Sequence, residues 1–308
     1  MSITIIKPGI SSSVQHFGNW GEQAYGIGIG GVMDEVSASA ANLICRNNIS
    51  SPVLEMTLHG TEMLFNEDAY IAFTGYGAEA MANGTILPFY RLLFIPAFTL
   101  IKMRPSIKGC RSYMAIAGRI EYNDIGSQLN TGDRITFLSS DHGFKEIKNF
   151  GKNIGISPWQ IQSNEKDFFR DSIDVIIGPE WDWFKASAQE AFLSNPFSIS
   201  IQSNRMGYRL NETISGLIEK RELTSTAVTK GIVQVTHEGN PIILMADAQT
   251  TGGYPRIARI APADISALAQ RRPGEKIRFN KITEDASLSK TNAQNSYLKK
   301  VKSSLTLT

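Results

Sequence analysis

Residues 53–58 read VLEMTL, and the alternation of apolar and polar residues places Leu54, Met56 and Leu58 on one face. A period of two is typical of a β-strand with one buried face. Other short segments have the same character: 70–74, 98–103, 111–117, 134–138, 174–177, 198–202, 232–235, 242–246 and 276–279. Gly, Asn and Asp fall between these segments, as turns require. The sequence therefore predicts a mainly β, α+β fold of antiparallel sheets or barrels rather than a doubly wound parallel sheet.

Helices are expected at three places in this β-rich chain. Asp34 is a candidate N-cap for a helix that ends near Arg46. A second helix is expected after Pro179, and a third begins near Pro262, because proline is favoured in the first turn of a helix. The residues expected to face inward are Val36, Ala40, Leu43 and Ile44, then Trp181, Phe184, Ala188 and Phe192, then Ile265, Leu268 and Ala269.

The length of 308 residues suggests about two domains. Residues 139–170 are polar with weak periodicity, so the boundary is expected there, between an N-terminal domain at 1–150 and a C-terminal domain at 151–284. The polar tail at 285–308 is expected either to form a helix through Ala293, Tyr297 and Val301 or to be disordered.

Charge and composition exclude several classes of protein. The net charge is +2, and it becomes −1 without residues 281–308, which hold five Lys and two acidic residues. Such a neutral body argues against a nucleic-acid binder. The two cysteines exclude a disulfide scaffold and a cysteine-rich zinc site. The most apolar stretch, 86–101, is interrupted by Pro88, Arg91 and Pro96, so we expect no membrane span and a cytoplasmic protein.

The glycine-rich segment 26–31 fits the letters of a dinucleotide-binding G-x-G-x-x-G loop. That site needs a buried strand just before the loop, and residues 19–25 are too polar to form one. A glycine loop that lines a site is the favoured interpretation. No G-x-x-x-x-G-K-[ST] sequence occurs. None of the four histidines has a His or Cys at ligand spacing, so no metal site is expected.

Two polar clusters are candidate site segments. Residues 247–255 read DAQTTGGYP and follow the apolar strand predicted at 242–246. Hydroxyls, an amide and glycine N–H groups at a strand end suit a carboxylate, or the oxyanion of an amide under attack. Residues 202–207 read QSNRMG, in which Arg205 is a candidate fork for a carboxylate or phosphate. The alternatives are a tight turn for the first cluster and a solvated arginine for the second.

With these motifs the sequence resembles the family of biotin-dependent carboxyltransferases and allophanate hydrolase subunit 2, which includes the C subunit of bacterial ATP-dependent 5-oxoprolinase. It is also similar to half of the carboxyltransferase region of urea carboxylase. The resemblance runs from about Ile5 to Phe279 and is most specific at 242–260. Further matching segments are Lys7-Pro8-Gly9, Val14-Gln15, Met33-Asp34, Leu54-Glu55, Thr57-Leu58 with Gly60, Ala115-Ile116-Ala117-Gly118, Gln202-Ser203 with Arg205-Met206-Gly207, and Leu268-Ala269-Gln270 with Pro273-Gly274.

The resemblance implies two cyclophilin-like β-barrel domains and a heteromeric complex. The partner is a sister subunit of the same family pair, with a third subunit in 5-oxoprolinase, and a small amide is the substrate. ATP is used by the assembled complex, and no covalently bound biotin is expected on this chain. The implied function is a subunit of a 5-oxoprolinase, which hydrolyses the 5-oxoproline lactam to glutamate. The alternatives are a carboxyltransferase-like or allophanate-hydrolase-like subunit acting on urea-type substrates, and a non-catalytic subunit that relieves inhibition of a kinase.

The resemblance also implies roles for individual residues. Gln249, Thr250, Thr251 and the N–H groups of Gly252 and Gly253 are expected around the reacting carbonyl, and Arg205 is expected to pair with a carboxylate or phosphate. Asp34, Glu55 and Asp247 are acid–base or orienting candidates, and the alternative for Asp34 is a helix cap. The full expected set is Asp247, Gln249, Thr250 and Thr251 as catalytic residues, and Gln15, Asp34, Glu55, Gln202, Arg205, Gly252, Gly253 and Tyr254 as substrate-binding residues.

The chain departs from the family pattern at positions that usually carry a charge. These positions are His16, Asn19, Asn204, Thr226 and Ala248. Almost every change removes an ionisable group, so we expect either a changed substrate or a chain that has lost part of its chemistry.

Overall fold

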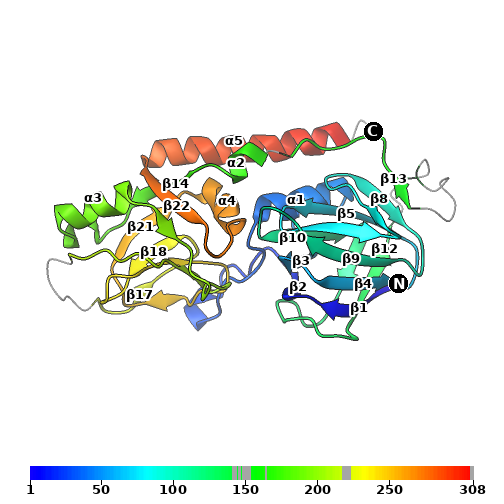
Figure 1. Cartoon of the computed structure of the whole chain (residues 1–308), viewed down its shortest axis with the longest axis horizontal. Coiled ribbons are helices and arrows are strands. Elements are labelled where there is room, and N and C mark those ends of the chain that lie inside the picture. Colours follow the sequence, from blue (N-terminus) through cyan, green and yellow to red (C-terminus); the bar gives the residue numbers. More distant parts are fainter. Residues whose placement is uncertain (141–143, 145–146, 148–153, 164, 217–222, 306–308) are drawn as a thin grey trace. The chain divides into compact units, whose positions relative to one another are not determined.

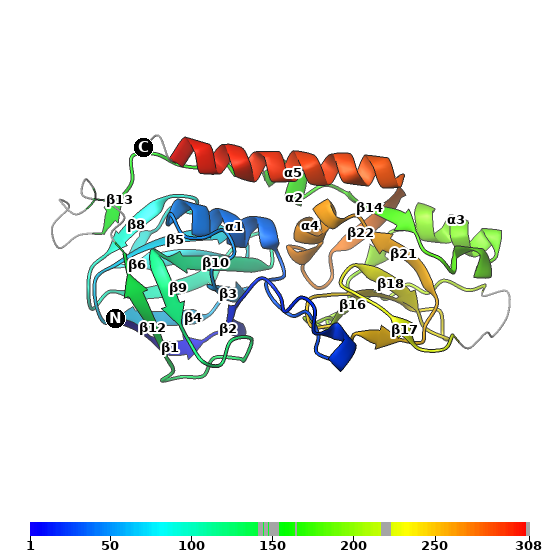
Figure 2. The same cartoon turned by 180° about the vertical axis from the view of Figure 1, so that it is seen from behind.

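The computed structural model describes residues 1–140, 144, 147, 154–163, 165–216 and 223–305. The chain divides into two compact units (Figures 1 and 2). Unit 1 comprises Met1–Phe17, Asp34–Asn164 and Ser296–Thr308, and unit 2 comprises Gly18–Met33 and Glu165–Asn295. This division differs from the expected one, which placed the boundary between the two domains at residue 150. The glycine-rich segment belongs to unit 2, and the end of the tail belongs to unit 1.

Unit 1 contains two antiparallel sheets that share one apolar core (Figure 1). The seven-stranded sheet has the order β11 (Gly118–Glu121), β12 (Arg134–Ser139), β1 (Ser2–Pro8), β4 (Thr61–Phe65), β9 (Leu100–Pro105), β6 (Ala78–Ala82) and β7 (Thr85–Ile86). The six-stranded sheet has the order β13 (Gly155–Ile156), β8 (Leu92–Ile95), β5 (Ala69–Gly75), β10 (Arg111–Ile116), β3 (Val53–Thr57) and β2 (Ser11–Gln15). The core contains side chains that are at most 1% exposed, such as Ile3, Phe65, Phe73 and Phe137.

Helix α1 (Glu35–Ile44) belongs to unit 1 and packs on β5 and β10 (Figure 2). Asp34 is its N-cap, because the Asp34 carboxylate accepts a hydrogen bond from the Ser37 N–H at 3.0 Å. Its inward residues are buried as the sequence predicts, and the strand predicted at 53–58 is β3. Leu58 does not continue that strand, because its φ of 56° turns the chain.

Unit 2 is built on a seven-stranded sheet with one small additional sheet (Figure 1). The main sheet has the order β15 (Phe197–Ser198), β22 (Lys276–Lys281), β14 (Ser172–Ile177), β21 (Arg256–Ile260), β18 (Ile232–Val235), β19 (Pro241–Leu244) and β16 (Gly207–Arg209), and the small sheet pairs β17 (Thr226–Ala227) with β20 (Thr251–Gly252). All its neighbouring strands are antiparallel except β14 and β22. The mainly β prediction with few helices is confirmed.

Unit 2 also contains several short helices. They are the 3₁₀ turns Gln23–Tyr25, Trp181–Trp183 and Pro262–Asp264, and α2 (Glu165–Phe168), α3 (Ala186–Ser194) and α4 (Ile265–Ala269). The prediction of a single helix after Pro179 is wrong. The segment forms a 3₁₀ turn and then α3, and Phe184 between them has an extended backbone. Phe184, Ala188 and Phe192 are buried as predicted.

Two other predicted strands begin or end elsewhere. Phe98 has a φ of 63° and is 80% exposed, so β9 begins only at Leu100. The strand predicted at 198–202 is wrong beyond Ile199, which still bridges Leu210, because the Ser203 N–H donates to the Ser200 carbonyl in a turn. Ile201 lies on that turn and is 87% exposed. In both cases a turn replaces the end of an alternating pattern.

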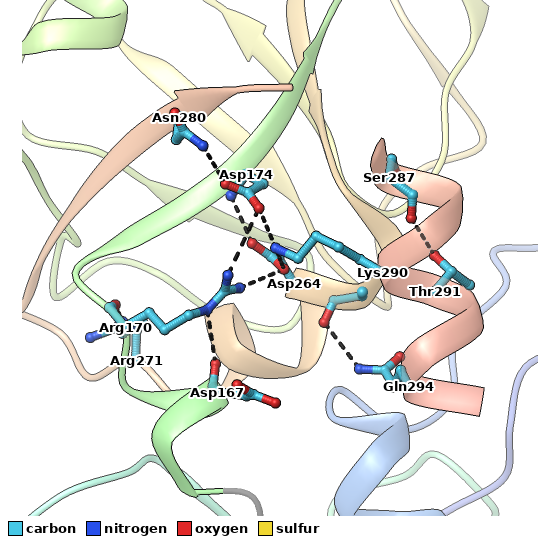
Figure 3. A network of polar contacts seen from close by, with 11 residues as sticks. Asp167, Arg170, Asp174, Asp264, Arg271, Asn280, Ser287, Lys290, Thr291 and Gln294 are labelled. Atoms are coloured by element: carbon cyan, nitrogen blue, oxygen red, sulfur yellow. Dashed lines mark hydrogen bonds and ion pairs between the residues drawn. The ribbon is translucent and has the colours of Figure 1, made fainter. Parts of the chain in front are cut away.

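The tail forms helix α5 (Glu284–Leu305), the first of the two expectations for this segment. Because its sequence is polar, this helix must be stabilised by tertiary contacts rather than by intrinsic helix propensity. Figure 3 shows Lys290 of α5 pointing toward the carboxylates of Asp174 and Asp264, with which it forms ion pairs. Asp264 also pairs with Arg170 at 2.6 Å and accepts the Asp174 N–H at 2.7 Å. No helix in the described residues is both long enough and apolar enough to cross a membrane.

Candidate functional site

A pocket of about 300 Å³ lies in unit 2 over one face of the main sheet. It is lined by Asn204, Met206, Gly207, Arg209, Val228, Gln234, Ile242, Leu244, Ala248, Gln249, Thr251, Gly252, Gly253 and Tyr254. Both polar clusters that the sequence singled out contribute to this list. The pocket therefore brings together segments that lie about 40 residues apart in the sequence.

The pairing of three strands builds the floor of the pocket. Ile242 of β19 pairs with Arg209 of β16 on one side and with Gln234 of β18 on the other. Directly paired residues in a sheet share a face, and residues two apart do so as well. Ile242 and Leu244 therefore face the pocket, while Ile243 between them is fully buried in the core.

The loop after β19 forms a wall of the pocket. Gln249, Thr251, Gly252, Gly253 and Tyr254 line it, as expected for the cluster at 247–255. Thr250 is not a lining residue, and its carbonyl accepts the Val228 N–H at 2.9 Å. The β17–β20 pairing of Ala227 with Thr251 continues this contact and fixes the wall.

Gln234 is a lining residue that the sequence motifs did not suggest. It is 5% exposed, and its amide donates to the Tyr254 carbonyl at 3.4 Å. A Cβ on Gly252 would lie 2.5 Å from the Gln234 Nε2 atom, so only glycine leaves room for this amide. The two residues thus form a polar end of the pocket.

Arg205 and Asp247 form a bidentate ion pair beside the pocket. The Arg205 Nε–H donates to Asp247 Oδ2 at 2.7 Å, and NH2 donates to Asp247 Oδ1 at 2.9 Å. The same NH2 group donates to the Gly31 carbonyl at 2.6 Å. Neither residue lines the pocket, and the pairing holds the ends of two segments together.

The glycine-rich segment 26–31 packs against the loop that follows β19. The Gly30 N–H donates to the Ala246 carbonyl at 3.0 Å, and a Cβ on Gly28 would lie 3.2 Å from the Ala248 carbonyl oxygen. A 3₁₀ turn, Gln23–Tyr25, precedes the segment. The segment therefore supports the wall of the pocket from outside, and the structure does not offer the strand that a dinucleotide loop needs.

The candidates of unit 1 lie in a buried cluster of hydrogen bonds. The Asp34 carboxylate caps α1, and the Asp34 N–H donates to the Tyr113 hydroxyl at 2.8 Å. That hydroxyl donates to Glu55 Oε2 at 2.9 Å, and Arg111 lies 3.8 Å from Glu55 Oε1. Burial raises the pKa of Tyr113 well above its ordinary value, and the charge of Glu55 raises this pKa further. Asp34 and Glu55 thus act at least as structural residues.

Gln15 and Gln202 have local partners of their own. The buried Gln15 amide donates to Ser13 Oγ at 2.8 Å within unit 1. The Gln202 N–H donates to Ser200 Oγ at 3.2 Å in an exposed turn of unit 2, and Gln202 does not line the pocket.

The positions that depart from the family pattern fall into two groups. Asn204 and Ala248 line the pocket, and Ala248 is 7% exposed. Thr226 lies in β17 beside the wall, and the Asn19 N–H donates to the Ile29 carbonyl at 2.7 Å. His16 belongs to unit 1. Two of the five positions at which the resemblance implies a different residue thus line the pocket.

The sequence motifs missed most of the floor of the pocket, namely Arg209, Gln234, Ile242 and Leu244. These four residues lie in strands whose facing direction depends on pairing. The Arg209–Ile242–Gln234 row is a consequence of register between segments far apart in sequence, and no local pattern reveals it. Among the described residues no group of three or more His, Cys, Asp or Glu could hold a metal ion.

Comparison with known proteins gives matches over nearly the whole chain. The C subunit of 5-oxoprolinase from Escherichia coli (strain K12) is 34% identical over 305 residues, which cover 97% of this chain and 97% of that protein. The same subunit from Haemophilus influenzae is 31% identical, with 94% of this chain and 95% of that protein covered. Urea amidolyase of Saccharomyces cerevisiae is 26% identical over 97% of this chain, which corresponds to 18% of that protein.

Solved structures show the same fold within larger proteins. The Kluyveromyces lactis urea carboxylase structure matches 97% of this chain with a TM-score of 0.83 at 22% identity, and this chain spans 29% of that chain. The structure of the K. lactis urea amidolyase matches with a TM-score of 0.82, and this chain spans 20% of it. Residues 25–281 match the family model described as carboxyltransferase domain, subdomain A and B. The chain therefore belongs to the carboxyltransferase-domain family.

Proposed function

We propose that this chain is a subunit of an ATP-dependent 5-oxoprolinase, which hydrolyses the lactam of 5-oxoproline to glutamate together with sister subunits. The observation that carries the proposal is the similarity to the C subunits of two 5-oxoprolinases, in which more than nine-tenths of both chains is aligned. A family match alone would leave the reaction open, because one fold hosts several activities.

The pocket of unit 2 is the proposed substrate site. Opening the lactam requires water to attack the ring carbonyl carbon, after which the C–N bond breaks and the nitrogen takes a proton. Negative charge develops on the carbonyl oxygen in this step, so hydrogen-bond donors aimed at that oxygen lower the barrier. The Gln249 amide, the Thr251 hydroxyl and the backbone N–H group of Gly253 are donors of this kind in the pocket wall, whereas the N–H group of Gly252 belongs to the β17–β20 pairing.

The other candidates have supporting roles in this proposal. Asp247 orients the wall through its pairing with Arg205, and Thr250 anchors the wall through its backbone contact with Val228. Asp34 and Glu55 stabilise unit 1 through the cluster around Tyr113. Tyr254 lines the pocket and makes an edge contact with His237 at a ring distance of 5.6 Å.

ATP is assigned to the assembled complex and not to this chain. The sequence has no G-x-x-x-x-G-K-[ST] loop, and in the glycine-rich segment the Gly30 N–H is already bonded to the Ala246 carbonyl. The described residues therefore do not fit a phosphate-binding loop of that kind. The role of this chain is to bind and orient the lactam.

Carboxyl transfer to a urea-type nitrogen is the second candidate, favoured by the similarity to urea amidolyase over 97% of this chain. Both reactions polarise an amide or urea carbonyl, so the same pocket donors would serve. That reaction needs a biotin carrier, and this chain corresponds to only 18% of the urea amidolyase.

The test is an ATP-dependent assay of 5-oxoproline conversion to glutamate by the complex, co-expressed with and without this chain. Glutamate formation that requires this chain is the expected result. A stable complex that forms no glutamate contradicts the proposal, and urea-dependent carboxylation by that complex would then favour the second candidate.

A further inference from the structure

We propose that Arg209, rather than Arg205, binds the carboxylate of the substrate and restricts the pocket to small lactams that carry one negative charge. This inference rests on the proposed function, because it places 5-oxoproline in the same pocket. It adds a binding residue that the sequence motifs did not suggest and a reason for selecting an anionic substrate.

The direction of the Arg209 side chain follows from the register of the sheet. Tyr208 pairs with Ile243, and both are buried in the core of unit 2. Arg209 pairs with Ile242, which lines the pocket. Because neighbouring residues on a strand point to opposite faces, the Arg209 side chain stands on the pocket face.

Arg209 is suited to an anion because its charge is available. Among the described residues that line the pocket it is the only basic one, and no Asp or Glu lines the pocket with it. In the described part of the chain its guanidinium has no hydrogen bond or ion pair, and the residue is exposed toward solvent. A guanidinium fork of this kind matches the two oxygens of a carboxylate.

Arg205 differs from Arg209 in each of these respects. Asp247 accepts two hydrogen bonds from its guanidinium, and the Gly31 carbonyl accepts a third. The carboxylate of Asp247 neutralises its charge, and Arg205 does not line the pocket. A substrate carboxylate at Arg205 would have to displace Asp247, whereas one at Arg209 would displace no hydrogen-bond partner among the described residues.

The dimensions of the pocket suit 5-oxoproline. Arg209 and Gln234 lie on β16 and β18 with β19 between them, which separates their backbones by about 10 Å. The apolar side chains of Ile242 and Leu244 cover the floor between the two polar ends. A five-membered lactam fits this pattern, with its carboxylate toward Arg209, its methylenes over Ile242 and its amide toward Gln234 and the Gly253 N–H group.

The test uses the complex assembled from this chain and its sister subunits, with Arg209→Gln and Arg209→Lys as variants. Arg278→Gln is the matched control, because Arg278 is an exposed arginine of β22 that lies outside the pocket and donates to the Ser194 carbonyl. Turnover gives KM and kcat for 5-oxoproline. Calorimetry with 5-oxoproline and with 2-pyrrolidinone, the neutral lactam without a carboxylate, gives binding independently of turnover.

For Arg209→Gln we expect KM for 5-oxoproline and its dissociation constant to rise about 10- to 100-fold, with kcat changed less than about threefold. Arg209→Lys should recover part of the affinity, and binding of 2-pyrrolidinone should be the same in all variants. Equal affinity of the wild-type protein and Arg209→Gln for 5-oxoproline overturns the inference while turnover still supports the proposed function.

A complex that binds 5-oxoproline through Arg209 without turning it over contradicts the proposed reaction and leaves the carboxylate site standing. A wild-type complex that binds no 5-oxoproline overturns the inference directly.

Discussion

The pocket of unit 2 and the buried cluster around Asp34 in unit 1 hold similar polar residues in opposite situations. In the cluster, the Asp34 carboxylate accepts bonds from the Ser37 N–H and from Ser37 Oγ at 2.6 Å, and Tyr113 links Asp34 to Glu55. In the pocket, Arg209 and Gly253 are lining residues, and the Arg209 guanidinium has no hydrogen bond or ion pair in the described part of the chain. A motif rich in polar residues therefore does not by itself identify a site.

The difference lies in what a ligand would have to displace. Removing a protein partner from a buried carboxylate lowers the free energy of unfolding, because the carboxylate is left without a hydrogen bond. Substituting a group that faces the pocket removes mainly contacts with water and costs the fold little. Substitutions in the cluster should therefore change the free energy of unfolding, and substitutions in the pocket should change substrate affinity. Each of the following experiments tests one side of this contrast.

The largest effect on stability is expected for Asp34→Ala. The change removes the N-cap of α1 and leaves the Ser37 N–H without its acceptor inside the protein. We expect the free energy of unfolding to fall by about 3 kcal/mol in denaturant titrations of the isolated chain. Asp34→Asn keeps a capping oxygen and should lose less than half of this. Loss of 5-oxoproline affinity without loss of stability would give Asp34 a role in binding.

Gly252→Ala should give the opposite result in unit 2. The new Cβ would meet the flexible end of the Gln234 side chain, which can move, so stability should change by less than about 1 kcal/mol. Displacing the Gln234 amide from the polar end of the pocket should raise KM for 5-oxoproline about tenfold. Gln234→Ala is the companion variant and should raise KM similarly. Unchanged KM in both variants would remove Gln234 from the proposed site.

These contrasts also show how much of the molecule can be predicted from its sequence. Helix α1 and strand β3 were predictable because their signals are local: a capping Asp34 and an alternating pattern at 53–57. The wall of the pocket at 249–254 was predictable for the same reason. The sequence favours a glycine-rich segment that lines a site, but residues 26–31 are not lining residues of the pocket and contact residues 246–248 behind its wall.

The choice between Arg205 and Arg209 lay beyond sequence reasoning. The two are four residues apart, and strand alternation alone would place them on the same face. A turn intervenes, in which the Asn204 N–H donates to the Gly207 carbonyl at 3.1 Å, so alternation starts again only at β16. Only the pairing of Arg209 with Ile242 fixes its direction.

A smaller effect is expected for Ala248→Arg, which introduces the arginine that the family resemblance implies at this position. Ala248 lines the pocket and is 7% exposed, so an arginine there would add a second cation near the substrate carboxylate. We expect activity of the complex to rise about threefold through a lower KM. The control is Thr226→Glu, which restores an acidic group in β17 outside the lining. No change in Ala248→Arg would argue that the lost charge was not catalytic.

The smallest expected effect is the contribution of Asp174 to the pH dependence of the free energy of unfolding. It tests whether polar groups of unit 2 outside the pocket stabilise the fold, as the buried cluster does in unit 1. Burial alone would raise the pKa of Asp174, but hydrogen bonds from Lys290 and Asn280 outweigh it and hold this pKa below its ordinary value (Figure 3). A lowered folded pKa contributes stability that is complete above the unfolded value of about 3.9 and is lost as the pH falls through the folded pKa.

The free energy of unfolding should therefore fall below about pH 4, and Asp174→Asn should lose this part of the slope. Asp285→Asn removes the same charge from an exposed position of α5 and serves as the control. Equal slopes in the two variants would mean that the Asp174–Lys290 pair does not hold α5 on unit 2. A smaller slope in Asp174→Asn alone would show that the polar tail is helical because a partly buried ion pair anchors it, as Asp34 anchors α1.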